Sequence, residues 1–134
     1  MSKSLIQTVN AGPQAVAELG VIGLGTTVRR YGCNLHQISD AIEAEGCGYY
    51  TIDATVTLTP DAVGPVSVAV YNNGVAVPGT AVTGSVAAAG DSVTLPIVGT
   101  IRQGCNCNGA DSLTLVITDG ASTVTNVSMR VVKE

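Results

Sequence analysis

The sequence predicts an all-β domain, and three observations lead to that prediction. Hydrophobic residues form 46% of the chain, yet Phe and Trp are absent and Tyr occurs four times, so small aliphatic side chains such as Val must fill the core. Branched aliphatic side chains favour pleated strands. Apolar and polar residues alternate from Tyr49 onward, and turn residues interrupt the alternation about every ten residues, as in sandwiches and barrels.

The length of 134 residues fits one domain, which at this size buries about two-thirds of its unfolded surface. No linker, charge block or sizeable repeat divides the chain, so residues 1–134 are predicted to form a single domain. Residues 1–10 are either a first strand or a docking arm, and we favour the strand.

The first third of the chain gives a weaker signal. Glycines are distributed between Pro13 and Gly25, and they favour short strands and turns over a helix. Residues 38–44 have some helical character but fit a strand equally well, and we predict a strand.

The clearest strand covers residues 49–58. The side chains that point to one side are Tyr50, Ile52, Ala54, Val56 and Leu58. Because successive side chains of a strand point to opposite faces, Tyr50 is expected in the core and Tyr49 on the other face.

The same alternation recurs at residues 66–70, 93–97, 113–117 and 127–131. Asn73-Gly74 predicts a hairpin with a return strand starting at Val75. Asp119-Gly120 predicts a second turn. The stretch between Gly79 and Gly90 is either a strand or a surface loop.

Charge limits the classes of function. Charged residues form 12% of the chain and the net charge is −4. A surface so poor in charge protects weakly against self-association. The basic residues are scattered apart from the pair Arg29-Arg30, so nucleic-acid binding is not expected. No apolar run is long enough for a signal peptide or a membrane span, which predicts synthesis in a cytosol and no membrane partner.

The cysteines Cys33, Cys47, Cys105 and Cys107 allow three interpretations. A Cys33–Cys47 disulfide would close a short loop and contribute roughly 3 kcal/mol. All four can instead be free structural thiols. Metal ligation is the third interpretation, but the single residue between Cys105 and Cys107 fits poorly with the usual zinc spacing.

Residues suited to catalysis are sparse. His36 is the sole histidine and has no family signature around it, so we expect a solvated loop histidine. Glu43, Glu45 and Asp53 fit solvated strand faces better than acid–base pairs or a calcium loop. The sequence therefore predicts no enzymatic activity and no cofactor.

The order of segments resembles the tumour-necrosis-factor and complement-type jelly roll. The match is carried by Gly48 and Tyr50, by Asn73-Gly74 with Pro78-Gly79, and by residues 89–95. The sequence is also similar to small structural proteins of phages and prophages of gut Firmicutes. The resemblance implies a jelly-roll sandwich of about eight to ten antiparallel strands that forms a homotrimer.

A trimer is also expected on physical grounds, because a core of small side chains buries less apolar area than an aromatic-rich one. The candidate contacts between subunits are Tyr49, Tyr71, Arg29 and Arg30, although Arg29 and Arg30 also fit two strand residues facing opposite sides.

The predicted function is a non-enzymatic structural subunit of a virion, either a capsid decoration protein or a head-fibre protein. Its partners would be copies of itself and a major capsid or other virion protein. The alternative is a receptor- or glycan-binding module of a phage or cell-surface appendage, in which the sugar-stacking surface is limited to Tyr31, Tyr49, Tyr50 and Tyr71.

Overall fold

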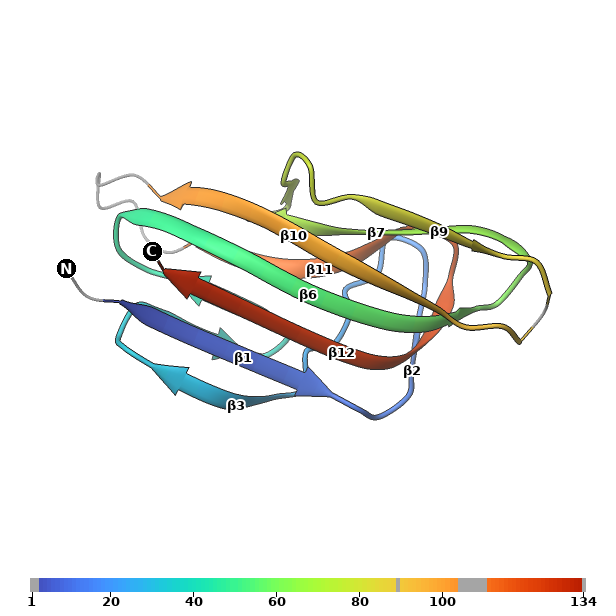
Figure 1. Cartoon of the computed structure of the whole chain (residues 1–134), viewed down its shortest axis with the longest axis horizontal. Helices are drawn as coiled ribbons and strands as arrows, with labels where there is room; N and C mark the ends of the chain where they lie inside the picture. Colours follow the sequence, from blue (N-terminus) through green and yellow to red (C-terminus); the bar gives the residue numbers. More distant parts are fainter. Residues whose placement is uncertain (1–2, 89, 104–110, 134) are drawn as a thin grey trace.

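The computed structural model describes residues 3–88, 90–103 and 111–133, and these form two antiparallel sheets that pack as a jelly-roll sandwich (Figure 1). The predicted fold class is confirmed. The described residues form twelve strands rather than eight to ten, because the chain adds very short segments at the sheet margins.

The first sheet has the strand order β10-β6-β12-β1-β3, and β2 also pairs with β12. Its strands are β10 (Val93–Gln103), β6 (Gly48–Pro60), β12 (Ser122–Lys133), β1 (Ser4–Asn10), β3 (Thr26–Tyr31) and β2 (Gln14–Val16). The long strand β6 is second from the β10 edge, between β10 and β12.

The second sheet has the strand order β4-β5-β11-β7-β8, and β9 also pairs with β7. Its strands are β4 (Leu35–Ile38), β5 (Ala41–Ala44), β11 (Asp111–Asp119), β7 (Gly64–Asn72), β8 (Val75–Ala76) and β9 (Val82–Val86). The weak stretch before Gly90 therefore contains a strand, β9.

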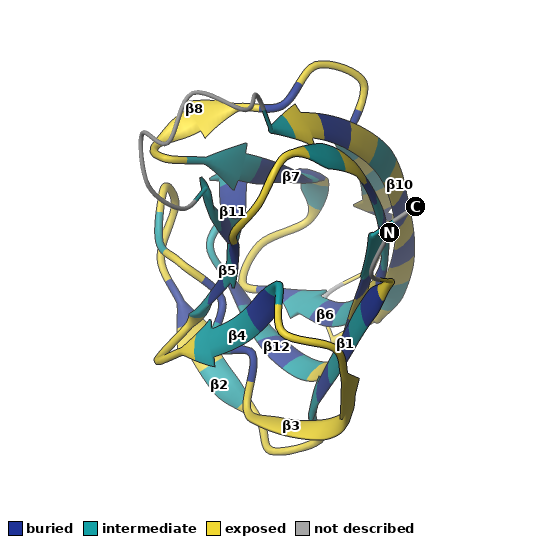
Figure 2. Ribbon diagram, turned by 90° about the vertical axis from the view of Figure 1, so that its left-hand side faces the viewer, coloured by how far each residue is buried: buried dark blue, intermediate teal, exposed yellow. Residues whose placement is uncertain are grey.

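The two ends of the chain lie at one end of the sandwich (Figures 1 and 2). Ser4 of β1 is the register partner of Lys133 of β12. The first-strand interpretation of residues 1–10 thus holds for Ser4–Asn10.

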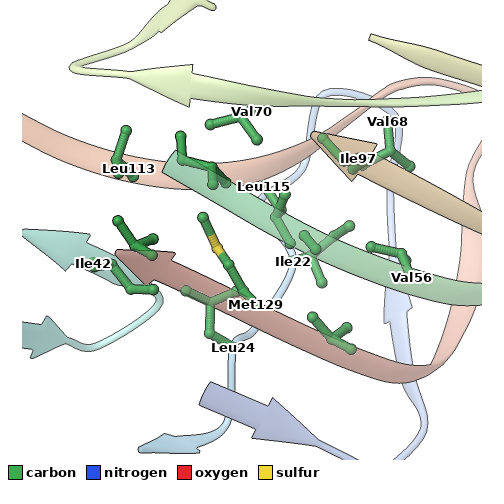
Figure 3. Close-up of a cluster of buried hydrophobic side chains, with 14 of the residues drawn as sticks. Ile22, Leu24, Ile42, Val56, Val68, Val70, Ile97, Leu113, Leu115 and Met129 are labelled. Carbon is green, nitrogen blue, oxygen red and sulfur yellow. The ribbon is translucent and has the colours of Figure 1, made fainter. Parts of the chain in front are cut away.

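The core lies between the two sheets and is aliphatic (Figure 3). Ile52, Val56 and Ile97 from the first sheet face Val70 and Leu115 from the second, and all five are fully buried. The segment between β2 and β3 contributes Ile22 and Leu24, also fully buried, and Val21 forms a bridge to Val116 of β11. Short strands and turns, as predicted, build the first third of the chain.

Tyr50 is a fully buried aromatic residue of this core. Its hydroxyl donates to the carbonyl oxygens of Glu45 and Gly46, each 2.8 Å away. Burial raises the pKa of Tyr50 above its usual value of 10.0, and the negative charges of Asp111 and Glu45 add to that shift. The prediction that Tyr50 is core and Tyr49 faces outward is confirmed.

The predicted hairpin after β7 is present. Asn73 and Gly74 have φ of 53° and 83°, the two positive values that a type I′ turn requires. Asn72 and Val75 are register partners on either side of the turn. Gly120 likewise has a φ of 81° in the turn between β11 and β12.

Residues 38–44 form a hairpin rather than one strand. Ile38 ends β4, Ser39 turns the chain with a φ of 54°, and Ala41 begins β5. His36 lies within β4, so the expectation of a loop histidine was wrong. None of the described residues belongs to a helix long and apolar enough to cross a membrane.

Candidate assembly surface

The outward side of the first sheet is an uncovered surface made by alternate residues of four strands (Figure 2). The antiparallel registers align these residues in rows across the sheet. One row is Gln7, Arg130, Asp53 and Val98. The rows on either side are Leu5, Val132, Thr51 and Thr100, and Val9, Ser128, Thr55 and Pro96. We call these three rows the assembly face.

The assembly face carries almost no net charge. Its two charged side chains are register partners, and the Arg130 guanidinium lies 2.7 Å from the Asp53 carboxylate. These side chains are 51% and 39% exposed, so the pair contributes at most about 1 kcal/mol to the monomer. Its main effect is to neutralise the centre of an otherwise uncharged surface.

The centre of the assembly face is hollowed. A depression of about 320 Å³ is lined by both charged residues and by Gln7, Ala54, Thr55, Pro96, Ile97, Val98 and Ser128. Val98 stands at its margin with 64% of its surface exposed. An exposed valine beside a shallow depression is suited to contact with another macromolecule.

The two tyrosines predicted at an interface lie on different sheets. Tyr49 is 55% exposed and lies on the outward side of β6, next to the assembly face. Tyr71 lies in β7 of the second sheet and is partly buried. A single flat contact therefore cannot include both residues.

Arg29 and Arg30 lie in β3, where all six residues are exposed. The Arg30 guanidinium donates to the carbonyl oxygen of Leu35 at 2.7 Å and to Nδ1 of His36 at 2.9 Å. Arg30 thus holds β3 of one sheet against β4 of the other. The Arg29 guanidinium bonds to the backbone oxygen of Val28.

His36 is held in one tautomer by these contacts. Because arginine can only donate, Nδ1 of His36 accepts from Arg30. Nε2 therefore carries the proton and donates to the carbonyl oxygen of Cys33 at 3.1 Å. Both ring nitrogens have partners, and neither partner is a nucleophile.

The cysteines match neither a Cys33–Cys47 disulfide nor four free thiols. Cys33 is exposed and free, whereas Cys47 is disulfide-bonded, so the Cys33–Cys47 disulfide was wrong. Cys105 and Cys107 lie outside the described residues. No group of three or more metal-ligating side chains occurs within residues 3–88, 90–103 and 111–133, and the disulfide-bonded Cys47 has no thiolate with which to join a four-cysteine metal site.

No protein-family model and no curated protein sequence matches this chain. Solved structures do match over nearly its whole length. Murine APRIL at pH 5.0 has a TM-score of 0.77 and 15% identity, covering 99% of this chain and 100% of that one. The globular domain of zebrafish complement 1qA protein has a TM-score of 0.69 and 5% identity, covering 94% of each chain.

The PRD1 vertex protein P5 matches with a TM-score of 0.58 and 17% identity, covering 97% of this chain and 96% of that one. Identities this low establish the shared jelly-roll fold alone, because one fold serves many functions.

Proposed function

We propose that this chain is a non-enzymatic structural subunit of a virus particle, and that it assembles as a homotrimer through the assembly face. The observation that carries the proposal is the composition of this face. Four strands present Thr, Ser and small aliphatic side chains to solvent, and the two charges among them neutralise each other. Such a surface has only one ion pair to desolvate when another subunit covers it, and its other side chains are uncharged.

The three rows of the face are large enough to form the centre of a subunit contact. Four strands spaced about 4.8 Å apart, with rows that span about six residues, cover roughly 400 Å². A standard interface buries about 800 Å² on each partner. Outward residues next to these rows, among them the exposed Tyr49, would supply the remainder.

A closed trimer also fits the separation of Tyr49 and Tyr71. In a ring, each subunit offers two different patches, because the contact is heterologous. Tyr49 would belong to the patch around the assembly face, and Tyr71 to the patch on the second sheet. The sequence resemblance to trimeric jelly rolls favours the same arrangement.

The role in a virion is supported by the likeness to a vertex protein and by the sequence resemblance. We propose a capsid decoration or head-fibre subunit that is made in the host cytoplasm and then binds a major capsid or other virion protein. A phage or prophage of gut Firmicutes as the source rests on the sequence resemblance alone.

The oligomer is tested by the native mass of the full chain in solution. A trimer has three times the chain mass of 13.4 kDa. We expect V98K to yield monomers, because assembly would bury an unpaired lysine. The matched control is V63K, since Val63 is 57% exposed and lies between β6 and β7, away from the face. A monomeric wild type, or a trimer that V98K leaves intact, contradicts the proposal.

The virion role is tested by mixing the tagged chain with purified particles of its source. We expect wild-type protein to co-sediment with intact particles at a fixed copy number relative to the capsid protein. Absence of the chain from purified particles, measured by quantitative mass spectrometry, would refute the virion role but would leave the proposed trimer unaffected.

A further inference from the structure

A groove separate from the central depression lies beside the last part of β10, next to the β7–β8 hairpin. Its volume is about 310 Å³, and its lining residues are Asn72, Val75, Ala76, Val77, Pro78, Thr100, Ile101 and Arg102. Ligand pockets begin at about 300 Å³, so the groove has room for one sugar ring.

The walls of the groove are held in place by packing. The segment after β8 lies against β10 (Figures 1 and 2). A Cβ atom on Gly99 would lie 2.5 Å from the Thr80 side chain, so glycine permits this close approach. The Thr80 hydroxyl donates to the carbonyl oxygen of Val77 at 2.8 Å and accepts from the amide of Val70 at 3.1 Å. The groove is therefore preformed.

Arg102 is the single charged residue in the lining of the groove. Its guanidinium has no hydrogen-bond or ion-pair partner among the residues that the structure describes. A guanidinium pairs with a carboxylate through two parallel hydrogen bonds. The lining thus holds one positive charge and no acidic residue. It therefore matches a ligand with one negative charge better than a phosphate, which carries nearly two negative charges at neutral pH.

The other lining groups suit a ligand rich in hydroxyls. Thr100 offers a hydroxyl that both donates and accepts. Asn72 is the other uncharged polar residue of the lining. Val75 is 70% exposed, and with Pro78 it gives an apolar wall for the C–H face of a sugar.

An aromatic side chain lies next to these groups. Tyr49 is the cross-strand partner of Arg102, and directly opposed residues of an antiparallel pair share one face, with Cβ atoms about 5 Å apart. Tyr49 is 55% exposed, so its ring is available to a sugar bound beside Arg102.

We propose that this groove binds a carboxylate-bearing sugar, a uronic acid unit of a polysaccharide, with Arg102 on the carboxylate and Thr100 on a hydroxyl. Because Thr100 also belongs to the assembly face, the site is accessible in the free subunit, and its binding is therefore measured in the monomeric V98K variant.

The test is an NMR titration of the full chain carrying V98K, which keeps the subunit monomeric, with glucuronate, glucose and inorganic phosphate. We expect saturable shifts at Asn72, Thr100 and Arg102 with glucuronate, and affinities at least about tenfold weaker for glucose and phosphate, because each lacks one half of the recognised chemistry. Equal binding of glucose or of phosphate would overturn the proposal.

Two variants complete the test. R102Q is expected to weaken glucuronate binding at least about tenfold. R29Q removes the same charge from an exposed strand position away from the groove and, in the same V98K background, is expected to bind as V98K alone does. Undiminished affinity in R102Q, equal losses in both variants, or no glucuronate shifts in V98K would refute the site. The spectrum of each free variant reports whether it is folded.

Discussion

The inward and outward sides of the first sheet use the same backbone for different purposes, and adjacent tyrosines show the contrast. Tyr50 points inward, is fully buried and donates to two backbone carbonyls. Tyr49 points outward and is more than half exposed. The inward side supplies the free energy of folding, whereas the outward side stays available for contacts with other molecules.

The largest expected difference between the two sides comes from truncating β6. I52A should lower the free energy of unfolding by about 2–5 kcal/mol, because it leaves a cavity in a fully buried position. T55A, on the outward side of the same strand, should change it by less than about 0.5 kcal/mol. Urea unfolding measures both values, and equal effects would contradict the assignment of the two sides.

Tyr49 and Tyr50 give a matched comparison with a smaller expected change in stability. Y50F should cost about 1–2 kcal/mol, because two carbonyl oxygens lose the donor they share. Y49F should be nearly neutral, since no such contact holds that hydroxyl within the described structure. Thermal unfolding measures the loss of stability in both variants. A larger loss in Y49F than in Y50F would contradict the assignment of Tyr50 to the inward side of β6.

The raised pKa of Tyr50 also predicts a dependence on pH. Above pH 10 the unfolded tyrosine ionises while the folded one stays protonated, so the folded state binds more protons and stability falls as pH rises. We expect this loss to be smaller in Y50F. Unfolding curves between pH 8 and about 11 measure this loss in the wild type and in Y50F. Equal losses of stability in the two proteins would mean that burial does not raise the pKa of Tyr50.

A buried threonine on the inward side offers a stabilising change. Thr8 is fully buried, and its hydroxyl has no hydrogen-bond partner in the described structure. T8V keeps the shape and removes the unsatisfied group, so it should stabilise the protein by about 1 kcal/mol. Denaturant midpoints measure the change, and a destabilised T8V would mean that the hydroxyl has a partner.

The smallest effect is expected for the Asp53–Arg130 pair in the isolated subunit. A double-mutant cycle with D53N and R130Q should give a coupling of at most about 1 kcal/mol, because both side chains are substantially exposed. In the assembled protein the coupling should increase, since burial removes the screening water. Equal coupling in monomeric V98K and in the wild type would place the pair outside the interface.

The sequence predicts most of the strands that have a neighbouring strand on each side. The alternation along β6 and the Asn73-Gly74 turn are local signals with a direct physical cause. It predicts less at the margins, where β3 is exposed along its whole length and has no inward–outward pattern to detect. The Ser39 turn inside residues 38–44 also escaped prediction, because serine only rarely takes a positive φ.

The sequence by itself determined an all-β chain, its core residues and its low charge, because strand period and composition are local properties. Tertiary structure alone decided the surfaces. It brought Asp53 to Arg130 across 77 positions, set Arg102 beside the β7–β8 hairpin, and left Cys33 free while Cys47 is bonded. Register between distant strands fixes such contacts, and register depends on the packing of the whole sandwich.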